Sequence, residues 1–170
     1  MHEKASKWLQ YCILNKCKSK GYALDIACGK GRNSLFLARY GYKVLAVDRN
    51  RESLNCFSNK NIIKLARDVE IIENWPIANF KFDVVIVTNF LNRKIFPFII
   101  RSVRKKGYLI YETFSKGHEK IGKPKNKNFI LNRYELISLC DKMKLICHET
   151  ISTHSYLKKY IKQYIICKNV

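Results

Sequence analysis

Residues 22–32 read Tyr-Ala-Leu-Asp-Ile-Ala-Cys-Gly-Lys-Gly-Arg, and residues 43–48 read Lys-Val-Leu-Ala-Val-Asp. The first apolar run leads into two glycines, and the second ends in a carboxylate. This pattern predicts a buried strand, a glycine turn, a helix and a second strand. Gly29 and Gly31 have no Cβ, so the backbone there can turn sharply and approach a ligand closely. Asp48 stands where a carboxylate accepts hydrogen bonds from a ribose diol, so the stretch predicts a nucleotide pocket.

The spacing of this turn differs from the dinucleotide-binding fingerprint, G-x-G-x-x-G. Here the order is Asp25-x-Ala27-x-Gly29-x-Gly31, and Ser34 stands where a third glycine would fall. Asp25 would repel a pyrophosphate, whereas it suits an ammonium or a hydroxyl group. The turn therefore favours a zwitterionic, cationic ligand such as S-adenosylmethionine over NAD. The alternative is a strand-turn-helix that binds nothing, in which Asp25 caps the turn.

This segment resembles motif I, with its following acidic residue, of class I S-adenosylmethionine-dependent methyltransferases. The sequence of residues 28–33, Cys-Gly-Lys-Gly-Arg-Asn, resembles that of the branch that includes tellurite-resistance-type methyltransferases. Residues 6–8, 68–76, 88–93 and 111–126 extend the resemblance to small bacterial methyltransferase-domain proteins. Two positions depart from the pattern. Ala27 replaces the first motif glycine, and Asn92 stands where that group often has histidine, which argues against a catalytic base at position 92.

The resemblance implies S-adenosyl-L-methionine as the cofactor. Asp68 would contact the adenine amino group and Val69 would pack on the ring. Arg49 would contact adenine or begin the next helix, and Cys28 would serve backbone geometry rather than nucleophilic chemistry. The complete set of cofactor-binding residues expected is Asp25, Ala27, Cys28, Gly29, Gly31, Asn33, Asp48, Arg49, Asp68, Val69 and Thr88.

Methyl transfer is an in-line displacement, so the protein mainly orients the donor and the acceptor. An acceptor that loses a proton needs a nearby base. Asn89 and Glu112 follow or end predicted strands at the edge where ligands bind in such sheets. We expect Asn89 to position the acceptor and Glu112 to act as base or orienting group. The residues expected to bind substrate are Phe90, Arg93, Phe114, Lys123 and Lys125.

The segment 115–128 contains five lysines, two glycines, one proline and a single acid, Glu119. A fourteen-residue connection without regular structure is longer than most and often forms a lid or binding loop. We expect it to overhang the acceptor side of the site and to touch an anionic substrate.

The chain alternates apolar strand patterns with amphipathic helix patterns, which predicts an α/β fold with a doubly wound parallel sheet. A short connection, 152–159, predicts a closing hairpin that makes the last strand antiparallel. The resemblance implies the same Rossmann-like, seven-stranded sheet. Helices are expected at 3–16 (within a leading segment, 1–20), 31–40, 51–58, 97–103 and 132–143, and strands at 23–27, 43–47, 62–66, 82–88, 107–111, 145–151 and 160–167.

Length and composition favour one domain over residues 1–170, with 47% hydrophobic residues. Seven cysteines in no metal-like spacing predict no metal site and suggest a reducing cytoplasm. No signal peptide or membrane-spanning run is evident. The net charge is +20, and residues 86–170 alone carry 18 basic and 5 acidic residues. Such an excess attracts polyanions, although codon bias toward lysine explains it equally well.

Two functions remain open. The first is a cytoplasmic methyltransferase whose acceptor is RNA or a small anionic molecule. The second is a non-catalytic, S-adenosylmethionine-binding nucleic-acid module.

Overall fold

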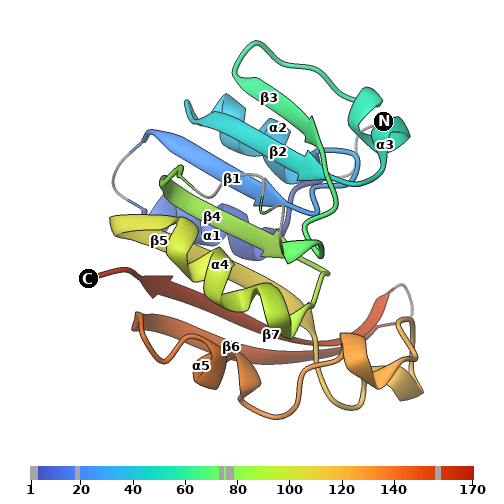
Figure 1. The fold of residues 1–170 in the computed structure, drawn as a ribbon. Coiled ribbons are helices and arrows are strands. Elements are labelled where there is room, and N and C mark those ends of the chain that lie inside the picture. The colour runs from blue at the N-terminus through green and yellow to red at the C-terminus, as the bar shows by residue number, and fades with distance from the viewer. Residues whose placement is uncertain (1–3, 18–19, 73–74, 76–78, 156–157) are drawn as a thin grey trace.

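A computed structural model describes residues 4–17, 20–72, 75, 79–155 and 158–170. Within these residues one sheet has the strand order β3-β2-β1-β4-β5-β7-β6 (Figure 1). Its strands are β1 (Tyr22–Ile26), β2 (Lys43–Asp48), β3 (Ile62–Ala66), β4 (Phe82–Thr88), β5 (Val103–Phe114), β6 (Lys144–Ser155) and β7 (Lys158–Lys168). The helices are α1 (Lys7–Asn15), α2 (Arg32–Arg39), α3 (Arg51–Asn55), α4 (Phe96–Ser102) and α5 (Glu135–Leu139), with 3-10 turns η2 (Arg93–Ile95), η3 (His118–Lys120) and η4 (Lys127–Phe129).

Strand pairing confirms the predicted fold class. The pairs β3-β2, β2-β1, β1-β4 and β4-β5 are parallel, while β7 runs antiparallel to both β5 and β6. Strand order reverses at β1, because β2 lies on one side of it and β4 on the other. Open α/β sheets bind ligands beyond the carboxyl ends of the strands at such a switch point. The fold thus directs attention to the turns that follow β1, β2 and β4.

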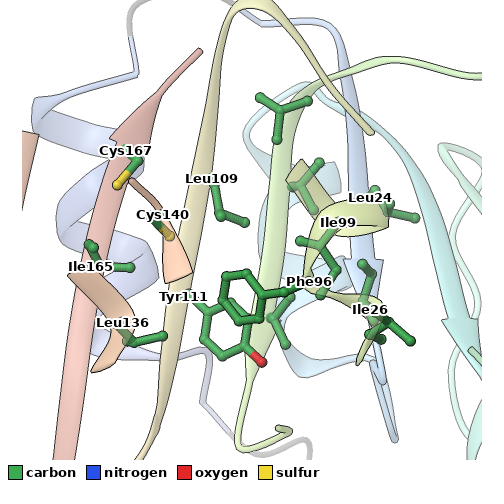
Figure 2. Close-up of a cluster of buried hydrophobic side chains, with 14 of the residues drawn as sticks. Leu24, Ile26, Phe96, Ile99, Leu109, Tyr111, Leu136, Cys140, Ile165 and Cys167 are labelled. Atoms are coloured by element: carbon green, nitrogen blue, oxygen red, sulfur yellow. The ribbon is translucent and has the colours of Figure 1, made fainter. Parts of the chain in front are cut away.

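Helices cover both faces of the sheet. Figure 1 shows α4 and α5 in front of it and α1 and α2 behind. On the α4 side, Phe96 stacks on Tyr111 with 5.1 Å between ring centroids, and both are buried with Leu136 and Ile165 (Figure 2). On the other side, buried residues of α1 and α2 pack on β1, β4, β5 and β7. Because both faces are covered, β4 is apolar almost throughout, as the sequence indicates.

Several element boundaries differ from the sequence predictions. The strand expected from Gly107 begins at Val103 and extends to Phe114, because its first residues already pair with Phe82 of β4. The helix expected over residues 132–143 is reduced to α5, since Tyr134 has a left-handed backbone (φ 59°) at its start. The last two strands, β6 and β7, are longer than predicted and include most of the residues expected in the connection 152–159. The leading helix begins at Lys7, after a Ser6 cap, and α3 ends at Asn55. Glu3 lies outside the described residues.

Buried Asp83 ties together the starts of three strands at the edge opposite the switch point. Its Oδ2 accepts a hydrogen bond from Tyr22 N–H at 2.7 Å, and its Oδ1 pairs with Arg104 at 2.5 Å. Space around the carboxylate is tight: a Cβ at Gly21 would lie 2.2 Å from Oδ2. Asp83 therefore helps to hold β1, β4 and β5 in register.

We expect Asp83→Ala to lower the free energy of unfolding by about 1–3 kcal/mol, because it leaves the Tyr22 N–H without its acceptor. Lys105→Ala, at an exposed position of β5, is the matched control. Since its side chain is exposed, its loss should change stability by no more than about 0.5 kcal/mol. Urea titrations of both variants measure the difference. Equal stability of Asp83→Ala and the parent chain would contradict this role.

Candidate active site

The turn after β1 has a left-handed backbone at three alternate positions. Ala27, Gly29 and Gly31 have φ values of 53°, 55° and 72°. A Cβ at Gly31 would lie 2.5 Å from the Phe57 ring, so glycine is required there by packing. A Cβ at Gly29 would meet no atom within 4 Å. The two glycines thus have different roles: Gly31 makes room for the Phe57 ring, and Gly29 leaves open space beside the backbone.

Asp48 holds this turn in place from the end of β2. Its Oδ2 accepts a hydrogen bond from Gly29 N–H at 2.7 Å, and its Oδ1 accepts one from Asn50 N–H at 2.8 Å. The carboxylate is therefore oriented by two backbone donors. It lies beside the open space at Gly29, with further lone pairs for hydrogen bonds.

A cavity of about 200 Å³ extends from this point toward the end of β3. Arg49 lies at its edge and pairs with Asp68 at 3.7 Å and with Glu70 at 3.6 Å. Val69, which is buried, provides an apolar wall. The lining residues are Ala27, Asp48, Arg49, Arg67, Asp68, Val69, Glu70, Phe90 and Phe129.

Five of the expected cofactor residues thus share one cavity. Phe90, expected on the substrate side, also lies here. Phe129 lines the cavity from η4, although no periodic pattern around it predicts this position.

Asp25 lies behind the turn, with no exposed surface. Its Oδ2 accepts a hydrogen bond from the Ser34 hydroxyl at 2.6 Å, while its buried Oδ1 has no hydrogen-bond partner. Burial raises the pKa of Asp25 to about 7, and the Ser34 hydrogen bond partly opposes that shift. Burial likewise raises the pKa of the Cys28 thiol, which opposes formation of a thiolate. Cys28 therefore fits the structural role expected for it.

Asn33 and Thr88 begin a hydrogen-bonded chain on the α1 side of the sheet. Asn33 Nδ2 donates to Thr88 Oγ1 at 3.0 Å, and Asn33 Oδ1 accepts from Ser6 N–H at 3.0 Å. The Ser6 hydroxyl donates to Glu112 Oε2 at 2.6 Å. Ser6 was not expected at the site. As an N-terminal helix cap it is recognisable in the sequence, but its link to Glu112 spans 106 positions.

Lys162 of β7 joins the two residues expected to act on the acceptor. Its Nζ donates to Asn89 Oδ1 at 2.6 Å and lies 3.6 Å from Glu112 Oε1. The same Nζ lies 5.0 Å from the centroid of the Phe114 ring and 5.4 Å from that of Tyr160. Burial lowers the pKa of Lys162, and the Glu112 carboxylate opposes that shift. Sequence reasoning missed Lys162, although its period-two alignment with Tyr160 and Tyr164 indicated an inward side chain.

Arg93 serves a different purpose from the one expected. Its guanidinium pairs with Glu135 and also donates to the carbonyls of Asn128 and Ile130. These bonds use four of its five N–H donors, so Arg93 fastens the 115–131 segment rather than presenting free donors to a substrate.

The segment expected to be an irregular loop is ordered. Buried His118 stacks on Phe114 at 4.2 Å, and its Nε2 lies 2.7 Å from the Lys123 carbonyl oxygen. Lys123 and Lys125 are exposed, so their side chains are outside the network around Glu112. Whether they touch substrate stays a prediction.

Within the described ranges, no three His, Cys, Asp or Glu side chains gather as a metal site would require. No helix in that part of the chain is long and apolar enough to cross a membrane.

The buried carboxyl group of Asp25 should make the free energy of unfolding decrease as the pH rises. Because folding raises its pKa from 3.8 to about 7, the folded state favours the protonated form, and stability falls as pH rises between those values. We expect Asp25→Asn to remove this loss. From pH 5 to pH 8 the variant should gain about 2–3 kcal/mol relative to the parent chain. Chemical denaturation at both pH values tests this, with exposed Asp141→Asn as control; parallel curves for Asp25→Asn and the parent would refute it.

Comparison with known proteins finds methyltransferases whose sequences are similar to this chain. The probable S-adenosyl-L-methionine-dependent methyltransferase TehB of Haemophilus influenzae is 36% identical over 98 residues, covering 55% of this chain and 33% of that protein. The putative methyltransferase YqeM of Bacillus subtilis is 27% identical over 128 residues, covering 67% of this chain and 49% of that protein. The chain thus spans between a third and a half of the length of these curated relatives.

Solved structures share the fold. TehB from H. influenzae matches with a TM-score of 0.72 and 20% identity, over 100% of this chain and 64% of that one. A S-adenosylmethionine-dependent methyltransferase from Methanosarcina mazei matches with a TM-score of 0.73 and 18% identity, over 99% of both chains. The N-methyltransferase NodS from Bradyrhizobium japonicum, in complex with S-adenosyl-L-homocysteine, gives a TM-score of 0.74 at 13% identity, over 95% of this chain and 83% of that one.

A family model, that of the tellurite resistance protein TehB, matches residues 11–111. This match runs from α1 to β5 and includes the glycine turn and Asp48. Since it covers more than half of the sequence, the chain belongs to the TehB family.

Proposed function

We propose that this protein is an S-adenosylmethionine-dependent methyltransferase. The observation that carries the proposal is the glycine turn fixed to Asp48, with open space at Gly29. Its relatives, by name methyltransferases, and its fold support the same conclusion.

The residues around the turn fit the donor. Gly29 would let the donor approach the backbone, and Asp48 would accept hydrogen bonds from ribose hydroxyls. Asp68 and Val69 would hold the adenine ring in the adjoining cavity. The unpartnered buried oxygen of Asp25 lies behind the turn, where the ionised form of this carboxyl group would attract a cationic ligand. When bound, S-adenosylmethionine supplies an electrophilic methyl group on a sulfonium.

On the acceptor side, the chain's own groups supply orientation and proton transfer. Asn89 follows β4, and its left-handed backbone (φ 56°) exposes a side chain that Lys162 holds at 2.6 Å. Glu112 is fixed by the Ser6 hydroxyl and by Lys162. We assign Asn89 to positioning the acceptor, Glu112 to accepting its proton, and Lys162 to positioning both. The ammonium also favours an anionic acceptor, either RNA or a small molecule.

A non-catalytic module that binds S-adenosylmethionine is the alternative. It needs Gly29 and Asp48 but has no use for the Ser6–Glu112–Lys162 network, so the network favours the enzyme. We also propose a cytoplasmic location, supported by seven free thiols, of which Cys12, Cys28, Cys140 and Cys167 are buried.

The test is transfer of a tritiated methyl group to the RNA, protein and small-molecule fractions of a cell extract. We expect label in one fraction with the parent chain, and a loss of about 10²-fold or more with Glu112→Gln, because a general base typically contributes that much. Asn89→Ala should also reduce transfer. Both variants should keep donor affinity, since neither residue lines the donor cavity.

Glu52→Gln, on the exposed surface of α3, is the matched control and should transfer at the parent rate. Labelling that survives both Glu112→Gln and Asn89→Ala would refute the assigned roles. No label in any fraction, with donor binding intact, would favour the non-catalytic module.

A further inference from the structure

A second cavity lies on the other face of the β5–β7 region from the Glu112 network. It encloses about 650 Å³ and is lined by Ser115, Lys116, Arg133, Tyr134, His148, Thr150 and Gln163. Neighbouring residues of a strand point to opposite faces. Lys162 faces Glu112 and Asn89, so Gln163 faces this cavity, which we call the hairpin groove.

The hairpin groove is basic and aromatic. Its charged lining residues are Lys116 and Arg133, and none of the described residues that line it is a carboxylate. The Arg133 guanidinium lies 5.2 Å from the centroid of the Tyr134 ring, and that ring is 6.1 Å from the His148 ring. Tyr134 is 51% exposed, which leaves part of its ring available for stacking. The groove therefore combines positive charge with an accessible planar ring.

The floor of the groove is rigid. Gln163 is fully buried, and its Nε2 donates to Ser115 Oγ at 2.8 Å and to the Asn132 carbonyl at 2.6 Å. Its Oε1 accepts from Leu136 N–H at 3.3 Å. His148 Nε2, by contrast, is buried without a hydrogen-bond partner. Tyr134 also keeps a left-handed backbone, a strained state for a non-glycine residue that clusters at binding sites.

The lysine-rich segment 115–128 begins at this groove, and the chain returns to the groove at residues 131–133. Ser115 bridges to Leu131, and Lys116 N–H donates to the Leu131 carbonyl at 2.9 Å, so the two ends of the segment are held together beside Arg133. Between them four further lysines are exposed: Lys120, Lys123, Lys125 and Lys127. A ligand longer than one nucleotide could therefore meet the groove and these lysines at once.

We propose that the hairpin groove binds a segment of single-stranded RNA. Lys116 and Arg133 each contact a separate phosphate, one base stacks on Tyr134, and the exposed lysines follow the flanking phosphates. Single strands suit this surface because their bases are free to stack on aromatic side chains. Duplexes hide those faces, and acidic peptides offer no such rings. The inference rests on the proposed methyl transfer, for which the bound RNA would be the acceptor, but it is tested by binding alone.

The test is fluorescence anisotropy of a labelled single-stranded 12-mer RNA of mixed sequence, without donor, from 50 to 200 mM KCl. Lys116→Glu with Arg133→Glu should weaken binding at least ~10-fold at low salt and make the slope of log K against log salt shallower by about 1.4, or 0.7 for each phosphate contact. Tyr134→Leu should weaken binding about 5-fold or more with an unchanged slope, whereas Tyr134→Phe should bind as the parent does.

The matched control is Lys60→Glu with Lys105→Glu, which changes the net charge by the same amount. Both residues are exposed, and they lie near the starts of β3 and β5, whereas the groove lies at the end of β5. An equal loss in this control would show general charge attraction and overturn the proposal. So would equal competition by duplex RNA or by an acidic peptide of the same charge, or no binding by the parent chain. Circular dichroism confirms that each variant is folded. Donor binding measured separately distinguishes failure here from failure of the proposed function.

Discussion

The hydrogen bond from Gly29 N–H to Asp48 is the constraint on which the candidate site depends. It joins the turn after β1 to the end of β2, so the backbone that faces the ligand and the carboxylate beside it are positioned by one contact. The contact forms because parallel strands bring their carboxyl ends to one edge, and because Gly29 adopts a left-handed backbone with no side chain in the way. Phe57 packs against Gly31 and supports the turn from behind.

The acceptor side is built differently, from contacts between distant parts of the sequence. Ser6 reaches Glu112, and Lys162 reaches Asn89, across 106 and 73 positions respectively. The antiparallel β7 makes this possible, since it places Lys162 beside Phe114 of β5. The same strand presents Gln163 to the opposite face. One hairpin thus contributes to two surfaces on opposite faces of the sheet, to the acceptor network through Lys162 and to the hairpin groove through Gln163.

The sequence was informative where chemistry is local. Gly29, Gly31 and Asp48 were expected together from one short motif, Asp68 and Val69 were expected near them from the family resemblance, and Asp48, Asp68 and Val69 do line one cavity. The order of helices and strands was confirmed. The sequence was less informative where a role depends on a distant partner. Lys162 and Ser6 carry no motif of their own, and the role of Arg93 is set by Glu135 and by carbonyls in another segment. Boundaries failed where tertiary pairing overrode propensity, as at the start of β5, or where one residue changed the backbone, as Tyr134 did before α5.

The central claim is that the open space beside Gly29 and Asp48 holds an adenosyl donor. Calorimetric titration with S-adenosylhomocysteine tests it most directly, because this product lacks the reactive methyl group and binds without turnover. We predict saturable heat with one-to-one stoichiometry for the parent chain, and an affinity at least ~10-fold weaker for Asp48→Ala, since the ribose hydroxyls lose their acceptor. Absence of heat from the folded parent chain, or equal affinity in Asp48→Ala, would contradict the account.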